Sequence, residues 1–215
     1  MAALLAALIL LIVASTFLES ISNGDLVQNG LVTLVYLSAL VAIAARRRTF
    51  VLALILIVPA IITKWLDHFR PGFLPPGLYV AIGMTCMAYI TVELLRYILR
   101  VPYVDSEVIF AGIAGYLMLA ILWAAAYMFI ARVSPGSIAF NSADAGHQRM
   151  DAFTAVYFSF GVLGTVGFGD IVPMGKAARL LAVFEATTGM FYVTILIARL
   201  VGLYSPQQSS VKEDR

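Results

Sequence analysis

Residues 165–170 read Thr165-Val166-Gly167-Phe168-Gly169-Asp170, and they lie shortly before the last long apolar segment of the chain. The two glycines alternate with larger residues, and glycine adopts positive φ at almost no steric cost. A stretch in which ordinary and positive-φ residues alternate can turn successive carbonyl groups toward one axis. Because stacked carbonyl oxygens can replace the hydration shell of a cation, this hexapeptide predicts a cation-binding backbone.

The composition is that of a membrane protein. Of the 215 residues, 62% are hydrophobic and 12% are charged, whereas soluble domains carry about 25% charged residues. The formal net charge of +2 is spread thinly and gives no footprint for nucleic acid. Cys86 is the only cysteine and lies in an apolar run, which excludes an intrachain disulfide and a cysteine-based metal set. We therefore expect an all-α membrane protein without a cofactor.

Six segments are apolar enough to be candidates for membrane-spanning helices. They cover residues 2–18, 30–45, 50–63 (extendable toward Leu66), 77–97, 107–131 and 178–204. Between the last two, residues 151–170 are too few and too polar at one end to cross, and we expect them to form a re-entrant segment. The sequence thus predicts a peripheral four-helix domain over 1–105, a pore domain over 106–204 and a short tail over 205–215.

Basic residues between the segments predict the orientation. Arg46–Arg48 follow the second segment, and Arg96 and Arg100 follow the fourth, so both loops are expected to be cytoplasmic. An even number of spans then puts both termini on the cytoplasmic side of the cell membrane and the re-entrant segment at its outer face. Met1–Thr16 ends in small residues, as a signal peptide does, but it lacks a basic region before its apolar core, and we expect it to be retained.

The re-entrant segment is expected to begin with a short helix. Asp151 is a candidate N-cap for a helix over residues 152–163. A helix that stops in mid-membrane points the negative end of its dipole at the interior, where it stabilises a cation. Non-helical backbone at this depth must line an aqueous path or be buried in protein, so residues 164–169 must do one or the other.

These residues carry a family resemblance. Tyr157-Phe158-Ser159, the hexapeptide and the following Pro173 resemble the pore helix and selectivity filter of potassium channels. Residues 185–204 are similar to the inner helix of the bacterial ion-channel pore family. The resemblance covers residues 106–204, and it implies a fold in which outer helix, pore helix, filter and inner helix follow one another.

The resemblance also implies which groups bind the ion. K⁺ would be held by the backbone carbonyls of Thr165, Val166, Gly167 and Phe168, together with the hydroxyl of Thr165. Gly169 would complete the filter, and Asp170 would lie at its outer mouth. One strand supplies one oxygen to each layer of ligands, so a complete site needs several copies around an axis. Ligand counting and the family both predict a homotetramer. Potassium uptake transporters resemble four fused units with degenerate filters, unlike this single unit.

The chain departs from the family pattern around the filter. Phe168 replaces the usual tyrosine and lacks the hydroxyl that would tie the filter to the pore helix. Val162 and Gly164 stand where hydroxyl-bearing residues are common. Gly161 occupies the position at which some members carry a glutamate partner for Asp170. We expect selectivity for K⁺ over Na⁺, with a less rigid filter.

Glu185 is an acid about two turns into the last apolar segment, where a charge is costly. It shares a helix face with Gly189, which by the resemblance lets the inner helix act as a hinge or pack closely. We expect Glu185 to lie against the pore helix or the back of the filter, bonded to Ser159 or to a backbone group, and outside the ion path. The sequence leaves open whether this acid is structural or acts in gating.

The six-segment layout resembles that of voltage-gated channels, but the fourth segment is no sensor. A sensor needs arginines at every third position, and residues 77–95 contain neither Lys nor Arg. We therefore expect little voltage dependence. Anionic lipid is a possible ligand of Arg46, Arg47 and Arg48, although we favour a role in topology. His147, in an outer loop, is expected to be solvated.

One alternative comes from another class of protein. Residues 167–170 also fit the Gly-x-Gly-Asp motif of intramembrane aspartyl proteases, a reaction that needs two carboxylates in one site. Asp67 and Asp105 lie in predicted loops, and the first four apolar segments contain no aspartate. The sequence therefore favours an ion channel over an enzyme. Within the channel class, a weakly selective cation channel is the alternative.

Overall fold

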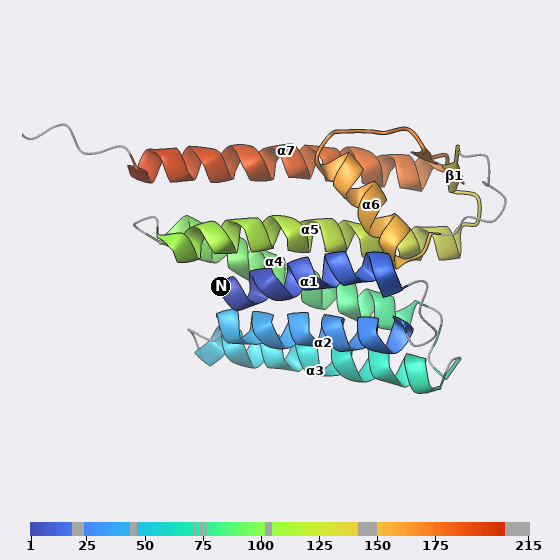
Figure 1. Ribbon diagram of the computed structural model, residues 1–215, viewed down its shortest axis with the longest axis horizontal. Helices are drawn as coiled ribbons and strands as arrows, with labels where there is room; N and C mark the ends of the chain where they lie inside the picture. Colours follow the sequence, from blue (N-terminus) through green and yellow to red (C-terminus); the bar gives the residue numbers. More distant parts are fainter. Residues whose placement is uncertain are drawn as a thin grey trace, which may run out of the picture.

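Long apolar helices make up most of the computed structural model, which describes residues 1–18, 24–43, 47–70, 72–73, 75, 77–101, 105–141 and 150–204. The helices are α1 (Ala2–Leu18), α2 (Gly24–Ile43), α3 (Arg47–Phe69), α4 (Leu78–Arg100), α5 (Ser106–Val133), α6 (Ala152–Leu163) and α7 (Lys176–Tyr204) (Figure 1). Two short strands, β1 (Ile138–Phe140) and β2 (Ile171–Pro173), pair antiparallel with Ala139 opposite Val172.

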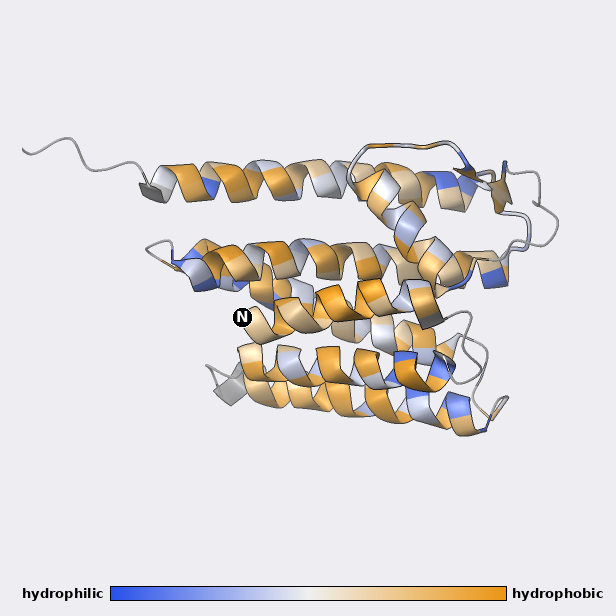
Figure 2. Cartoon of the chain, in the orientation of Figure 1, coloured by the Kyte–Doolittle hydropathy of each residue, from blue (hydrophilic) through white to orange (hydrophobic). Residues whose placement is uncertain are grey.

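Within these described ranges, five helices are long and apolar enough to cross a membrane, namely α2, α3, α4, α5 and α7. Apolar residues cover the helices along most of their length, and hydrophilic residues gather near the helix ends (Figure 2). The chain is an all-α membrane protein. Helix α1 has 17 residues and so spans about 26 Å, slightly less than the ~30 Å hydrocarbon core. The count of six spans therefore stays a prediction.

The helix bounds test the prediction from hydropathy. Helix α6 covers the predicted residues 152–163, and Asp151 Oδ1 accepts a hydrogen bond from Thr154 N at 2.8 Å, as its expected role of N-cap requires. Helices α2 and α3 are longer than the predicted 30–45 and 50–63. An apolar window stops at polar residues, but a helix continues through them because each backbone group needs a partner.

Helix α5 contacts both the N-terminal helices and the C-terminal helices α6 and α7. It packs against α1 and α4 on one side and against α6 and α7 on the other, and α6 lies obliquely between α5 and α7 (Figure 1). Glycines allow the close approach of α7. Tyr192 OH donates to Gly112 O at 2.8 Å, and a Cβ added at Gly115 would lie 2.4 Å from the Tyr192 hydroxyl. Small residues commonly permit such contacts between membrane helices.

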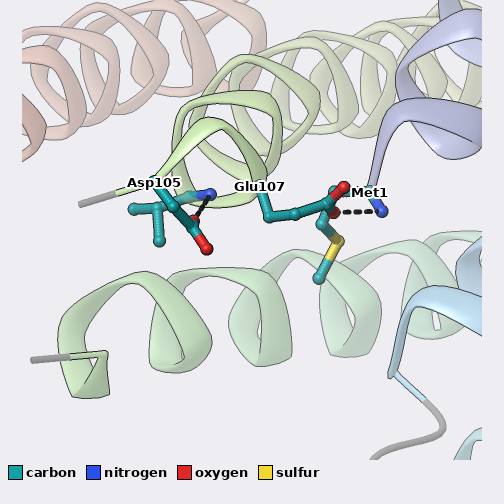
Figure 3. A network of polar contacts seen from close by, with 4 residues as sticks. Met1, Asp105 and Glu107 are labelled. Carbon is teal, nitrogen blue, oxygen red and sulfur yellow. Dashed lines mark hydrogen bonds and ion pairs between the residues drawn. The ribbon is translucent and has the colours of Figure 1, made fainter. Parts of the chain in front are cut away.

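The termini lie at one end of the bundle. The N-terminus and the C-terminal end of α7 are both at the end opposite β1 and β2 (Figure 1). At this end, Asp105 Oδ1 accepts from Val108 N at 3.0 Å and caps α5, while the Met1 amino group donates to Glu107 Oε2 at 2.8 Å (Figure 3). The cap satisfies a backbone N–H that the helix itself leaves free.

An arginine joins α7 to α4 at the same end. Arg199 donates from Nη2 to Leu99 O at 3.2 Å and to Val101 O at 2.9 Å. The final carbonyls of a helix have no partner within it and carry the negative end of its dipole, so a guanidinium is a favourable partner for them. The C-terminal half of α7 is thereby attached to the C-terminal end of α4.

Candidate ion-conducting site

The site begins where α6 ends. After Leu163 the chain turns and returns to β2 in an extended stretch (Figure 1). Backbone N–H groups of this turn bond to carbonyls of the last turn of α6: Val166 N and Gly167 N lie 2.8 and 3.2 Å from Gly161 O, and Thr165 N lies 2.9 Å from Val162 O. The start of the filter segment, defined here as residues 165–169, is therefore fixed to the C-terminal end of the short helix.

The filter segment alternates between two backbone conformations. Thr165, Gly167 and Gly169 have φ of 55°, 60° and 82°, while Val166 and Phe168 between them do not have positive φ. The sequence predicts this conformation at the glycines. Thr165 extends it by one residue, although a β-branched residue at positive φ is strained. This alternation is the geometry that aligns successive carbonyls for a desolvated cation.

The outer end of the filter segment is held by Asp170 and by Asn141, the residue that follows β1. Asp170 uses both carboxylate oxygens, accepting from Tyr157 OH at 2.8 Å and from Ile171 N at 3.0 Å. Asn141 contributes two more bonds, from its side-chain Nδ2 to Gly169 O at 3.0 Å and from its N–H to Asp170 O at 2.7 Å. Four hydrogen bonds thus fix the position of the last two residues of the hexapeptide.

Tyr157 also supports the filter through its ring. The rings of Tyr157 and Phe168 are stacked, with centroids 5.6 Å apart and planes 9° from parallel. Gly161, one turn after Tyr157 on α6, lies beside the Phe168 ring, and a Cβ added there would be in ordinary contact with Phe168 Cδ2 at 3.7 Å. A cavity of about 30 Å³ remains between these residues, which is enough space for at least one water molecule. Phe168, which lacks a hydroxyl, is thus held by stacking.

The contacts of Tyr157 and Asn141 with the filter segment were not predicted from the sequence. For Tyr157 there was a signal, because residues four apart on a helix share a face and Gly161 faces the filter. Asn141 gave no signal, since it lies 28 residues before the Gly169 carbonyl that it binds. The departures from the family pattern at Phe168, Val162 and Gly164 suggest a loosely held filter. The side chains of Tyr157 and Asn141 nevertheless supply contacts at its outer end.

Replacing Tyr157 by phenylalanine tests the bond to Asp170. The ring and its stacking on Phe168 remain, and only the hydroxyl donor is lost. We expect a measurable fall in K⁺-over-Na⁺ selectivity in single-channel recordings, because Asp170 loses one of its two side-chain hydrogen bonds. Tyr79→Phe, which removes a hydroxyl bonded to Arg132 far along the chain, is the control. Unchanged selectivity in Tyr157→Phe would show that the bond is dispensable.

The predicted buried acid lies behind α6. Glu185 is fully buried, and its carboxyl contacts Ser159 Oγ on α6 and, at 2.5 Å, Tyr127 OH on α5. This is the position that the sequence predicts, against the pore helix and bonded to Ser159. One turn further, a Cβ added at Gly189 would lie 2.3 Å from Leu163 O. Helix α7 runs unbroken through Gly189, so close packing is what this glycine provides in the structure.

Other residues singled out in the sequence are placed as follows. Asp67, predicted in a loop, instead lies in the last turn of α3, because the helix continues past the apolar window; Asp105 is the N-cap of α5. Arg47 and Arg48 begin α3. Arg46, His147 and the tail 205–215 lie outside the described residues.

Comparison with known proteins bears on the same part of the chain. Residues 115–205 match the ion channel family. The chain is 35% identical over 66 residues to two-pore potassium channel 1 of Arabidopsis thaliana, an alignment that covers 31% of this chain and 18% of the plant protein. It is 36% identical over 53 residues to the voltage-gated potassium channel Kch of Escherichia coli, covering 25% of this chain and 12% of that protein.

These alignments cover less than a fifth of the length of either relative. No solved structure gives a significant match to the chain. The matched residues include the second half of α5, all of α6, the filter segment and α7. The family and the relatives are ion channels and not enzymes, which argues against the protease alternative. Residues 115–205 are therefore similar to the ion channel family, and the curated relatives that the chain matches are potassium channels.

Proposed function

We propose that this protein is a potassium-selective channel subunit that conducts K⁺ passively across the cell membrane. The observation that carries the proposal is the backbone of the filter segment, in which Thr165, Gly167 and Gly169 alternate in positive φ with Val166 and Phe168. Carbonyls aligned by this alternation would serve as ligands for dehydrated K⁺, with Asp170 fixed at the outer mouth. The permeant ion is the substrate, and the proposal includes no cofactor.

A homotetramer is part of the proposal. One filter segment supplies one carbonyl to each layer of a binding site, so four chains would surround the ion. In the single chain, Val166 and Phe168 are 59% and 66% exposed. Apolar side chains of α7 such as Phe184 and Phe191 are also exposed. Exposed apolar surface next to a polar backbone segment supports a contact with neighbouring copies there, while lipid would cover the remainder.

The orientation and gating follow from charge. The N-terminus and the C-terminal end of α7 lie at the end opposite the strands β1 and β2 (Figure 1), and the basic residues at Arg46–Arg48 and Arg96 support a cytoplasmic location for that end. In α4 the basic residues are Arg96, which pairs with Glu93 at 2.5 Å, and Arg100 at the helix end. With no arginine ladder in α4, the channel would respond little to voltage.

Recording from the purified protein in planar bilayers tests the function. We expect a reversal potential close to the K⁺ equilibrium potential in mixed K⁺ and Na⁺, block by Ba²⁺, and open probability that changes little with voltage. Liposomes without protein and the variant Gly167→Ala are the controls. Equal permeability to K⁺ and Na⁺ would mean that the protein is the weakly selective cation channel of the alternative. Absence of any cation current would refute the proposal.

A further inference from the structure

The carboxyl of Glu185 connects three helices in the interior of the protein. It is fully buried on α7, with Tyr127 OH of α5 at 2.5 Å from Oε2 and Ser159 Oγ of α6 in contact with Oε1. Ser159 Oγ also lies 2.8 Å from Ala120 O of α5. Four polar groups therefore form one chain of contacts, Tyr127, Glu185, Ser159 and Ala120.

Counting protons along this chain distinguishes the two states of the acid. The Ser159 hydroxyl has one proton and two oxygen neighbours, and the Ala120 carbonyl can only accept. An ionised Glu185 can also only accept, so one of the two contacts of Ser159 would bring together two oxygens with no proton between them. If Oε1 carries a proton, Tyr127 donates to Oε2, Oε1–H donates to Ser159 Oγ, and Ser159 donates to Ala120 O. Every donor then has one acceptor.

Among the residues that the structure describes, no cationic side chain pairs with Glu185. Neither of the ion pairs in the described ranges involves Glu185. Arg179, six residues earlier on α7, donates to Pro173 O. The titratable groups that face the carboxyl from α5 are the phenols of Tyr116 and Tyr127, and α6 presents only the Ser159 hydroxyl. A buried carboxylate without a cation is expensive, whereas a neutral acid is satisfied by hydrogen bonds alone.

We propose that Glu185 is a neutral carboxylic acid whose proton donates to Ser159 and positions the pore helix between α5 and α7. A second contact lies one turn further along both helices, where Gly189 of α7 meets the Leu163 carbonyl of α6. Glu185 and Gly189 are four residues apart on α7, and Ser159 and Leu163 are four residues apart on α6, so one face of α7 contacts one face of α6 over a full turn. The filter segment begins two residues after Leu163, and Glu185 thus acts on it as a positioning residue.

The test compares Glu185→Gln with the wild-type tetramer. The amide keeps an acceptor for Tyr127 and a donor for Ser159, so Glu185→Gln should retain the melting temperature and the K⁺-over-Na⁺ selectivity of the wild type. Glu185→Ala, Ser159→Ala and Tyr127→Phe each remove a partner and should lower the melting temperature by several degrees. Tyr127→Phe keeps the ring that packs edge-on against Phe158.

Infrared spectroscopy at neutral pH reads the proton directly. The wild type should show the carbonyl stretch of a protonated carboxylic acid, and Glu185→Gln should lose it. Glu107→Gln, which changes a half-exposed acid at the start of α5, is the matched control and should leave that band in place. The spectrum does not depend on conduction, so its result is separate from that of the proposed function. The inference is overturned if wild type and Glu185→Gln differ only in a carboxylate band, or if the glutamine variant is as unstable as the alanine variant.

Discussion

Gly167→Ala is expected to abolish selective K⁺ conduction. Gly167 has φ of 60°, and an L-residue in this left-handed region costs about 1–2 kcal/mol per chain. Nothing lies within 4 Å of the added Cβ, so the effect comes from the backbone and not from a collision. If the residue relaxes to negative φ, its carbonyl leaves the axis in every subunit. We expect K⁺ flux into liposomes to fall by more than tenfold.

Gly136→Ala is the matched control for this prediction. Gly136 has φ of 81° in the turn before β1, and nothing lies within 4 Å of its added Cβ either. Its substitution imposes comparable strain at a position outside the filter segment, so flux should stay near the wild-type value. Equal losses in both variants would mean that strain destabilises the fold generally, and full activity in Gly167→Ala would remove the basis of the proposed ion site.

Gly189→Ala is expected to separate α7 from α6. The added Cβ would lie 2.3 Å from Leu163 O and 2.9 Å from Leu163 Cδ1. Leu163 is the last residue of α6, and its backbone carbonyl cannot turn away as a side chain can. Overpacking of this kind costs about 1–3 kcal/mol, and contact with backbone places this site at the upper end of that range. We expect a lower melting temperature of the purified protein and a loss of conduction.

Gly202→Ala provides the comparison within the same helix. Gly202 also lies in α7, but nothing is within 4 Å of its added Cβ. Alanine favours a helix by about 1 kcal/mol over glycine, so this variant should be as stable as the wild type or more stable. A Gly189→Ala protein that melts with the wild type would contradict the close contact between α6 and α7. A bending role for Gly189 is a separate prediction, which only kinetics of opening can test.

The parts of the fold that depend on local patterns were predictable from the sequence. Asp151 caps the helix that it was expected to cap, and α6 has the expected bounds because its apolar residues lie between a cap and a glycine. The helix ends of α2 and α3 were not predictable from hydropathy, since polar residues such as Asp25 and Lys64 continue a helix whose backbone bonds are already formed. Trp65 even bonds to Thr33 in this polar part, joining the two helices.

The site divides in the same way. Positive φ at Gly167 and Gly169 follows from residue type, and a buried acid in an apolar helix must find a hydrogen-bonding partner, which limited the choice for Glu185 to polar neighbours such as Ser159. Positive φ at Thr165 has no signal in its residue type, because a β-branched residue disfavours that conformation. The bonds from Asn141 depend on how distant segments meet, since Asn141 directly follows β1, which pairs with β2, and lies 28 residues before the Gly169 carbonyl that it binds.

The bonds of Arg199 have a mechanical consequence. Its guanidinium holds the carbonyls of Leu99 and Val101, just where α4 ends and the chain turns toward α5. Displacement of the end of α4 along the bundle must therefore either break both bonds or pull the far end of α7 with it. Helix α4 carries no ladder of charge, but these bonds attach it to α7, the helix that follows the filter segment. A force that moves the end of α4 is therefore transmitted to α7 through these two bonds.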